Sequence, residues 1–296
     1  MILIAGGTGF VGSHLVSRLI NEGHKVRCVV REGSSKVGRI KDLGVEIAAG
    51  DISDPASLNN ACKGIDTVIH LVGIIQEQKG MTFQSIHVDG TRNLINAAKK
   101  NNVRLFYYQS ANGADKNGRT AYYRTKAEAE EIVKASGLDY IIFRPSLIYG
   151  NGDEFVLRLT KIIREAPVIP IIGSGESLLQ PIFIDDLIAC LIKAITTPQF
   201  RSRTFCVAGP EQIRFEDIIN RIADAMGIKK SKFHIPVTLM RPAAMIMEAL
   251  LPKPPVTWEQ IIMLQGDNVC DIKEMKEVFN IEPVPFNEGL KRFLVL

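Results

Sequence analysis

The chain has 296 residues, of which 46% are hydrophobic, and its 36 basic and 32 acidic side chains leave a net charge of +4. This composition is typical of a globular protein, and the small, evenly spread charge excess argues against nucleic acid as a partner. The 5 cysteines and 5 histidines are scattered, which predicts reduced thiols and no metal site. The chain opens directly on an apolar strand and contains no apolar stretch long enough to cross a bilayer. We therefore expect a cytoplasmic protein without a signal peptide or transmembrane segment.

A glycine-rich segment follows the apolar run at residues 2–5 and precedes a helical pattern over 13–22. Gly7, Gly9 and Gly12 fit the pattern G-x-G-x-x-G. Strand, glycine turn and helix in this order make a pyrophosphate site for a dinucleotide, because glycine lets the backbone approach the phosphates and the helix N-terminus attracts their charge. An ordinary glycine-rich turn is the alternative interpretation. The residues expected at this cofactor site are Gly6, Gly7, Thr8, Gly9, Phe10, Val11 and Gly12.

The first half of the chain alternates short apolar runs with helical patterns. Runs rich in Val and Ile are typical of parallel strands buried on both faces, and repeated strand–helix units indicate a doubly wound sheet. We predict an α/β fold of the Rossmann type, with a dinucleotide-binding domain over 1–150, a smaller α/β lobe over 151–296, and part of 182–208 packed back on the first domain. The expected strands are 2–5, 25–30, 45–48, 67–71, 104–109, 140–143 and 204–208, and the expected helices are 13–22, 55–62, 83–101, 122–136, 184–195 and 216–226.

The residue at the end of the second strand indicates which dinucleotide binds. NAD sites place an acidic side chain about 20 residues after the glycines, but this chain has Arg31 there. Because a guanidinium can bind a 2′-phosphate, we predict NADP(H) in preference to NAD(H). A solvated Arg31 without this role is the alternative. Asp51, after the third strand, can accept from the adenine amino group or serve a helix start. The other residues expected along the cofactor are Ile52, Leu71, Val72 and Gly73.

The segment 122–126 contains the pattern Y-x-x-x-K. Positions i and i+4 of a helix share one face, about 6 Å apart along the axis. Lys126 can therefore lie beneath both the Tyr122 phenol and a ribose, where its charge favours the phenolate. Tyr122 then acts as acid or base during hydride transfer, and Ser110, after the fifth strand, binds the same substrate oxygen. Tyr123 is the rival phenol, but it stands only three residues from Lys126.

As a set, these features resemble the short-chain dehydrogenase/reductase superfamily, and within it the extended and atypical branch, the NAD-dependent epimerase/dehydratase family. The resemblance covers the chain at least to Asp186. It implies the Rossmann fold, the Ser–Tyr–Lys roles given above, and cofactor contacts from Pro145, Ser146 and Ile148 beside the nicotinamide. The matching pieces are Gly6 to Gly12, Gly50-Asp51, residues 87–93, Ser110, Tyr122 with Lys126, and residues 144–150.

The C-terminal part is similar to a narrower subgroup, which contains the 39 kDa accessory subunit of respiratory complex I. The similar segments are 254–260 and 264–269. This likeness implies tight NADP(H) binding and a quinone-related or electron-transport role. The fit to sugar-nucleotide epimerases is poorer, since only 11 residues separate Ser110 from Tyr122. The substrate is accordingly expected to be a sugar nucleotide or a quinone-like molecule.

Two functional hypotheses follow from these features. The first is an NADP(H)-dependent oxidoreductase or epimerase that uses Ser110, Tyr122 and Lys126. The second is a non-catalytic NADP(H)-binding protein, such as a redox sensor or an assembly factor, which has no need of those three side chains. The methionine-rich stretch 237–251 is expected to be a helix that covers the core of the lobe. Its alternatives are a lid over an apolar substrate or a peripheral contact with a membrane.

Overall fold

The computed structural model describes residues 1–251 and 254–294. It divides into two compact units, one formed by residues 1–144 and 187–205 and the other by residues 145–186 and 206–296. None of the described helices has the length and apolarity that crossing a membrane requires.

A seven-stranded sheet forms the first unit, with the strand order β11-β6-β5-β4-β1-β2-β3. The pairings among β1 to β6 are parallel. The order reverses between β1 and β4, which is the topological switch point where open α/β sheets bind their ligands. The predicted Rossmann fold is therefore confirmed. The strands are β1 (Ile2–Ala5), β2 (Val26–Val30), β3 (Glu46–Ala49), β4 (Thr67–His70), β5 (Leu105–Gln109), β6 (Asp139–Pro145) and β11 (Arg203–Val207).

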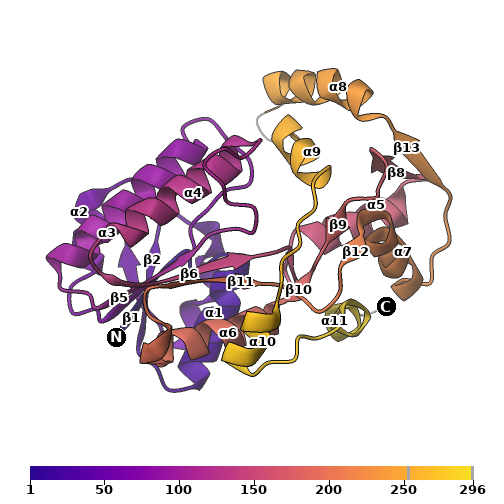
Figure 1. Cartoon of the computed structure of the whole chain (residues 1–296). Coiled ribbons are helices and arrows are strands. Elements are labelled where there is room, and N and C mark those ends of the chain that lie inside the picture. The colour runs from indigo at the N-terminus through magenta and orange to yellow at the C-terminus, as the bar shows by residue number, and fades with distance from the viewer. Residues whose placement is uncertain (252–253, 295–296) are drawn as a thin grey trace. The chain divides into compact units, whose positions relative to one another are not determined.

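Helices cover both faces of this sheet (Figure 1). On one face lie α2 (Pro55–Ala61), α3 (Gly90–Lys100) and α4 (Ala121–Lys134), and on the other lie α1 (Phe10–Asn21) and α6 (Ile184–Thr196). The apolar sides of α2, α3 and α4 pack on the strands to form one core cluster, which accounts for the helical spacing in the sequence. The helix expected over 83–101 begins as a π-helical segment, Gln84–Asp89, before α3.

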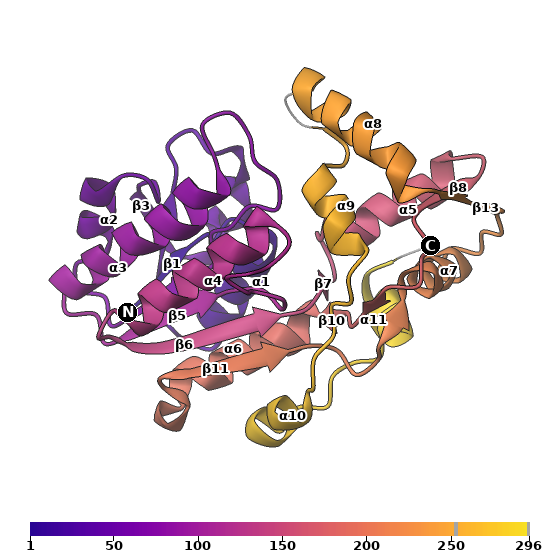
Figure 2. The same ribbon diagram turned by 45° about the horizontal axis from the view of Figure 1, so that its top comes forward.

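The second unit is built from helices and pairs of very short strands (Figure 2). Strands β7 and β10 pair in parallel, as do β8 and β13, whereas β9 and β12 are antiparallel. Its core includes the apolar side of α7, formed by Ile218, Ile219 and Ile222. The elements are β7 (Ile148–Tyr149), α5 (Phe155–Glu165), β8 (Ile169–Ile172), β9 (Leu178–Leu179), β10 (Ile182–Phe183), β12 (Ile213–Arg214), α7 (Phe215–Ala225), β13 (Lys232–Ile235), α8 (Val237–Leu250), α9 (Trp258–Leu264), α10 (Lys273–Phe279) and α11 (Phe286–Phe293).

The helix expected within 237–251 is present as α8, but its expected role in covering the core is wrong. Ala244 is the one residue of α8 that is buried. The helix is apolar around most of its circumference, so a single apolar side could pack inward while the rest stayed exposed to water.

Candidate active site

The glycine turn between β1 and α1 is held by close backbone contacts. Gly6 has a φ of 93°, and its carbonyl accepts from the Gly9 N–H at 3.0 Å. A β-carbon on Gly12 would lie 2.1 Å from that same carbonyl oxygen, well inside van der Waals contact. The first turn of α1 can approach the loop this closely only because residue 12 is glycine.

The N-terminus of α1 fits an anionic ligand. Gly9 caps the helix without a side-chain hydrogen bond, and the first turn contains no acidic residue. The Gly9 carbonyl already accepts from the Ser13 N–H at 2.9 Å, while the amides of residues 10–12 have no partner inside the helix. Three main-chain donors at the positive end of a helix dipole form a suitable cradle for a pyrophosphate.

The end of β4 lies against this cradle. A β-carbon on Gly6 would lie 3.1 Å from the backbone nitrogen of Val72. The structure therefore brings the predicted cofactor residues Leu71, Val72 and Gly73 to the glycine turn, across the switch point. Ile52 is buried, and its carbonyl accepts from Nδ2 of Asn93 at 3.1 Å, so this residue joins the end of β3 to α3.

Two arginines lie at the expected adenosine end of the cradle. Arg31 has a 64% exposed side chain, and its Nε is 4.0 Å from Oδ2 of Asp51. The other carboxylate oxygen of Asp51 accepts from the amide and hydroxyl of Ser53, at 2.8 and 2.6 Å. Arg39, which the sequence analysis missed, donates from Nη1 to the Thr8 carbonyl at 3.4 Å. Asp54, and not Asp51, caps the following helix.

Lys126 is buried beside the ends of β4 and β5. Its Nζ donates to the Gln109 carbonyl at 3.0 Å and lies 5.2 Å from the centre of the Tyr108 ring. A β-carbon on Gly73 would lie 3.1 Å from Nζ, so the ammonium also reaches the end of β4. Burial lowers the pKa of Lys126 to about 8, and the Glu130 carboxylate opposes this shift.

His87, on the π-helical segment, fixes the position of the Tyr122 ring. The two rings meet edge to face, with their centres 5.5 Å apart. Nε2 of His87 lies 3.1 Å from both the amide nitrogen and the carbonyl oxygen of Ile74. Nδ1 lies 3.0 Å from Oγ1 of Thr125, and that hydroxyl donates to the Ala121 carbonyl. Burial and the Lys126 charge lower the pKa of His87 to about 2, so His87 is a neutral packing residue.

The two phenols of the Y-x-x-x-K segment face different neighbours. Tyr122 packs on Phe83 and His87, and a β-carbon on Gly73 would lie 3.5 Å from Nε2 of that same His87. Tyr123 lies over the loop at Gly113, where a β-carbon would come within 3.0 Å of its ring. Tyr122, rather than its neighbour, therefore belongs to the cluster around Lys126 and the end of β4.

The expectation that the Lys126 charge favours the phenolate of Tyr122 is wrong for the ligand-free chain. Burial raises the pKa of Tyr122 above its usual value, and the nearby Tyr123 phenol adds to the rise. The Lys126 ammonium donates its hydrogen bond to the Gln109 carbonyl, so the desolvation of Tyr122 outweighs any stabilisation of its phenolate. The Tyr122 phenol is therefore protonated at neutral pH.

Ser110 carries a buried hydroxyl that lacks a partner. Its side chain is 4% exposed, and within residues 1–251 and 254–294 no group hydrogen-bonds to its Oγ. Its amide donates to the Phe143 carbonyl at 2.7 Å, which fixes the backbone next to the Gln109 carbonyl that holds Lys126. A buried hydroxyl without a partner is costly, and a substrate oxygen would satisfy it.

An ion pair that the sequence analysis missed supports Lys126 from the next helical turn. Glu130 is buried, and both of its carboxylate oxygens accept from Arg144, at 2.8 and 2.7 Å. The spacing of four residues between Lys126 and Glu130 on α4 was visible in the sequence, but the partner on β6 was not.

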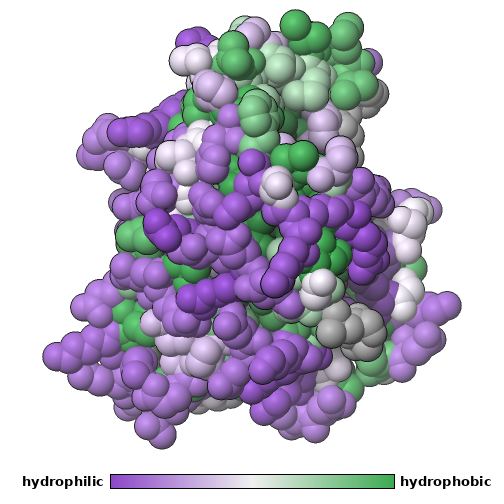
Figure 3. Space-filling view, turned by 90° about the vertical axis from the view of Figure 1, so that its right-hand side faces the viewer, coloured by the Kyte–Doolittle hydropathy of each residue, from purple (hydrophilic) through white to green (hydrophobic). Residues whose placement is uncertain are grey.

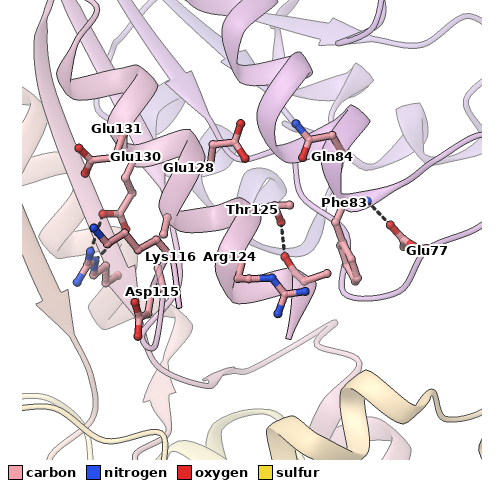
Figure 4. Close-up of a pocket in the computed structure, with 14 residues that line it drawn as sticks. Glu77, Phe83, Gln84, Asp115, Lys116, Arg124, Thr125, Glu128, Glu130 and Glu131 are labelled. Atoms are coloured by element: carbon pink, nitrogen blue, oxygen red, sulfur yellow. Dashed lines mark hydrogen bonds and ion pairs between the residues drawn. The ribbon is translucent and has the colours of Figure 1, made fainter. Parts of the chain in front are cut away.

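A groove of about 890 Å³ runs along the outer side of α4. Figure 4 shows charged side chains directed into it from α4 and from the loop at Asp115 and Lys116. Neither the glycine turn nor Lys126 contributes to its lining, and so many charges make it a poor site for an apolar molecule. Its charged residues are Glu77, Asp115, Lys116, Arg124, Glu128, Glu130, Glu131 and Arg144.

The remaining predicted cofactor residues belong to the second unit. Pro145 is the last residue of β6, and Ile148 begins β7. The Ser146 amide donates to the Val207 carbonyl at 2.9 Å, and its hydroxyl donates to the Gln180 carbonyl. Their contact with the nicotinamide stays a prediction.

Comparison with known proteins supplies the family. Residues 2–208 match the model of the NAD dependent epimerase/dehydratase family. A ceramide reductase of Caulobacter vibrioides is 30% identical over 236 residues, which cover 80% of this chain and 74% of that protein. A 3 beta-hydroxysteroid dehydrogenase/Delta 5→4-isomerase of Mycobacterium tuberculosis is 28% identical over 270 residues, with coverage of 79% and 71%.

The narrower likeness to complex I subunits is also confirmed. The NADH-ubiquinone oxidoreductase 40 kDa subunit of Neurospora crassa is 24% identical over 285 residues, which cover 95% of this chain and 75% of that subunit. Among solved structures, the UDP-glucose 4-epimerase of Thermotoga maritima, determined with UDP-glucose, shares the fold with a TM-score of 0.76. It is 21% identical, with coverage of 98% and 96%. The chain belongs to the NAD dependent epimerase/dehydratase family and is an oxidoreductase or epimerase of that family.

Proposed function

We propose that this protein is an NADP(H)-dependent oxidoreductase that interconverts a carbonyl and an alcohol on an apolar, lipid-like substrate. The observation that carries the proposal is the cluster at the ends of β4 and β5. There the buried Lys126 and the Tyr122 ring, both on α4, lie near the unpaired Ser110 hydroxyl that follows β5. We interpret the unpaired Ser110 hydroxyl as a hydrogen-bond donor for a substrate oxygen.

The roles of the three side chains follow from their protonation. When bound, the nicotinamide supplies or accepts the hydride. In the direction of reduction, Tyr122 donates its proton to the substrate oxygen as an alcohol forms, and its raised pKa keeps that proton in place beforehand. Ser110 donates a hydrogen bond to the same oxygen. Lys126, charged below about pH 8, is placed to donate a hydrogen bond to the cofactor ribose.

The substrate class is inferred from the relatives. Two of the similar proteins are a reductase named for ceramide and a dehydrogenase named for a hydroxysteroid. Both names describe an oxygen function on a large apolar skeleton. A sugar nucleotide is the second candidate, supported by the fold shared with a UDP-glucose epimerase.

Substitution of the two neighbouring tyrosines tests the proposal. We expect Tyr122→Phe to lower kcat by about 10²–10⁴, as for loss of a general acid, with the Kd for NADPH changed less than threefold. Tyr123→Phe is the matched control and retains activity. Assays with a ceramide-type ketone, a 3-ketosteroid and a UDP sugar separate the substrate classes. Unchanged turnover in Tyr122→Phe would remove Tyr122 from the mechanism.

The preference for NADP(H) is proposed from Arg31 and Arg39. Both guanidinium groups lie on the expected adenosine side of the glycine turn, and Arg31 has a largely exposed side chain whose pairing with Asp51, at 4.0 Å, is loose enough for it to turn to a 2′-phosphate. We expect the double variant Arg31→Ala/Arg39→Ala to weaken NADPH binding at least about tenfold and to leave NADH binding nearly unchanged. Wild-type protein that binds NADH as tightly as NADPH would contradict the preference.

A further inference from the structure

Helix α8 exposes large apolar side chains to solvent. Leu239, Met245, Ile246 and Leu250 are 64%, 56%, 59% and 74% exposed. Along the helix, residues 239, 242, 246, 249 and 250 fall on one face, since they recur at intervals of three and four. This face, which we call the α8 outer face, contains no charged residue. A helix in a water-soluble protein normally places its polar side there.

The two charged residues of α8 are turned toward α9. The Arg241 guanidinium lies 5.4 Å from the centre of the Trp258 ring. The Glu248 carboxylate accepts from the Trp258 amide at 2.5 Å. Because both charges are used on that side, the α8 outer face offers almost no hydrogen-bonding side chain by which a protein partner could be specified.

The strand that precedes α8 exposes a further large apolar side chain. Phe233, on β13, is 62% exposed. Figure 3 shows the apolar atoms gathered at the top of the view, where α8 lies in Figure 1, above a largely hydrophilic surface. A contiguous exposed apolar patch of this kind marks an interaction site.

The charged residues near this patch indicate what kind of partner would bind it. Residues 229–251 contain the cations Lys229, Lys230, Lys232 and Arg241 and the carboxylate of Glu248. Lys232 is paired with Glu216 on α7, and Arg241 lies over Trp258. The positive charge next to the exposed apolar residues is therefore that of Lys229 and Lys230, which donates to two backbone carbonyls and keeps its charge. Apolar side chains beside basic ones match the surface of an anionic bilayer, whose headgroups attract cations while its acyl region takes up apolar groups.

The size of α8 fixes how it could meet a bilayer. Its 14 residues extend about 21 Å, which is short of the hydrocarbon thickness of about 30 Å. The helix can therefore lie in the plane of the interface but cannot cross it.

We propose that the α8 outer face, together with Phe233, docks the protein peripherally on an anionic phospholipid membrane. The inference rests on exposure and charge, not on the proposed reaction, although a membrane surface is where a lipid-like substrate of that reaction would be found. Binding to vesicles and turnover are measured separately, so either proposal can fail without the other.

Vesicle flotation of the full chain tests the docking. The probes are vesicles of phosphatidylcholine alone and vesicles that also contain about 30% phosphatidylglycerol. We expect binding to the anionic vesicles, weakened several-fold as the salt concentration is raised from about 0.1 to 0.5 M. The triple variant Leu239→Ser/Ile246→Ser/Leu250→Ser is expected to lower the bound fraction at least about tenfold, with an unchanged thermal midpoint.

A matched pair of single variants controls for general loss of surface apolarity. Ile246→Ser is compared with Ile47→Ser, which changes the same residue type at a 41% exposed position on β3. The proposal expects only the first to weaken binding. Triple-variant binding equal to wild type would overturn it. The proposal would also be overturned if the wild-type protein did not bind anionic vesicles but sedimented as a dimer while the triple variant was a monomer. In that case the α8 outer face would bind a second copy of the chain.

Discussion

The cluster around Lys126 in the first unit and helix α8 in the second solve opposite problems. Around Lys126, charged and polar groups are buried, and most find partners within the chain, such as the Gln109 carbonyl and the Glu130–Arg144 pair. Along α8, apolar side chains are exposed, and its two charged side chains, Arg241 and Glu248, both contact Trp258. Both arrangements are unfavourable for a chain that acts alone in water.

The contrast indicates that the two regions bind different kinds of partner. Within the part of the chain that the structure describes, buried polar atoms without a partner remain around Lys126 on His70, Tyr108, Gln109 and Ser110, and α1 begins without a side-chain cap. These exceptions are small and polar, and we propose that a substrate and a dinucleotide meet part of them. The exception at α8 is broad and apolar and fits a surface. We therefore expect the residues around Lys126 to contact a bound cofactor and substrate, and the exposed residues of α8 to contact a membrane.

Truncating one leucine in each region sharpens this contrast most strongly. Leu94 on α3 is fully buried, whereas Leu250 on α8 is 74% exposed. We expect Leu94→Ala to lower the free energy of unfolding by about 3 kcal/mol and Leu250→Ala to change it by less than about 0.5 kcal/mol. Urea denaturation measures both. Equal losses would mean that α8 is packed within the protein after all.

Filling the glycine turn tests the polar region next. A β-carbon at Gly12 would collide with the Gly6 carbonyl, so Gly12→Ala must displace the start of α1. We expect NADPH affinity to fall at least about 100-fold, with a loss of stability of about 1–3 kcal/mol from overpacking. Gly266→Ala is the control, because a β-carbon there meets its nearest atom at 3.9 Å. Isothermal titration supplies the affinities, and an unaffected Gly12→Ala would break the assignment of the cradle.

Removing a buried charge and its exposed neighbour has a smaller effect. Glu130 has a 1% exposed side chain and binds Arg144, while Glu131 beside it is 73% exposed. Glu130→Gln leaves the guanidinium without its carboxylate and should cost about 2 kcal/mol of unfolding free energy, less than for a fully buried pair. Glu131→Gln should cost at most about 0.5 kcal/mol. If the two variants melt alike, the ion pair contributes nothing to stability.

The smallest expected effect is a pH dependence of cofactor binding. Burial lowers the pKa of Lys126 to about 8, so the ammonium is present below that pH and is lost as the pH rises through it. NADPH affinity should therefore decrease several-fold between pH 7 and pH 9. His87, with a pKa of about 2, should contribute no step between pH 5 and pH 7. In Lys126→Met the affinity should be weak and flat over the same range.

Local patterns in the sequence predicted the parts of the site that lie within single segments. The glycine turn was visible because its spacing is short and its flanking strand and helix confirm it, and Tyr122 with Lys126 was visible because i and i+4 share a helix face. Arg39, which reaches the Thr8 carbonyl, and Arg144, which reaches Glu130 from β6, could not be found this way, since only the folded chain brings them near.

The second unit was harder to predict for a different reason. Strands such as β7, β9 and β10 have two residues each, too few to show a period of two. In α8 the apolar composition predicted the helix correctly but could not tell which side faces solvent, because residues on every side are apolar. The direction of the pKa shift of Tyr122 was also predicted wrongly. The shift is caused by the burial of the phenol, and that burial depends on Phe83 and His87, which are distant in sequence.

Titration of ligand-free protein with pyridine dinucleotides tests the central claim most directly. That claim is that the amides at the start of α1 and the ends of β1 and β4 form a dinucleotide site. We expect saturable binding of NADPH, measured by the fluorescence of the dinucleotide. NADH should bind more weakly, and Gly12→Ala should lower the NADPH affinity at least about 100-fold. Failure of the wild-type protein to bind either dinucleotide at millimolar concentration would contradict it.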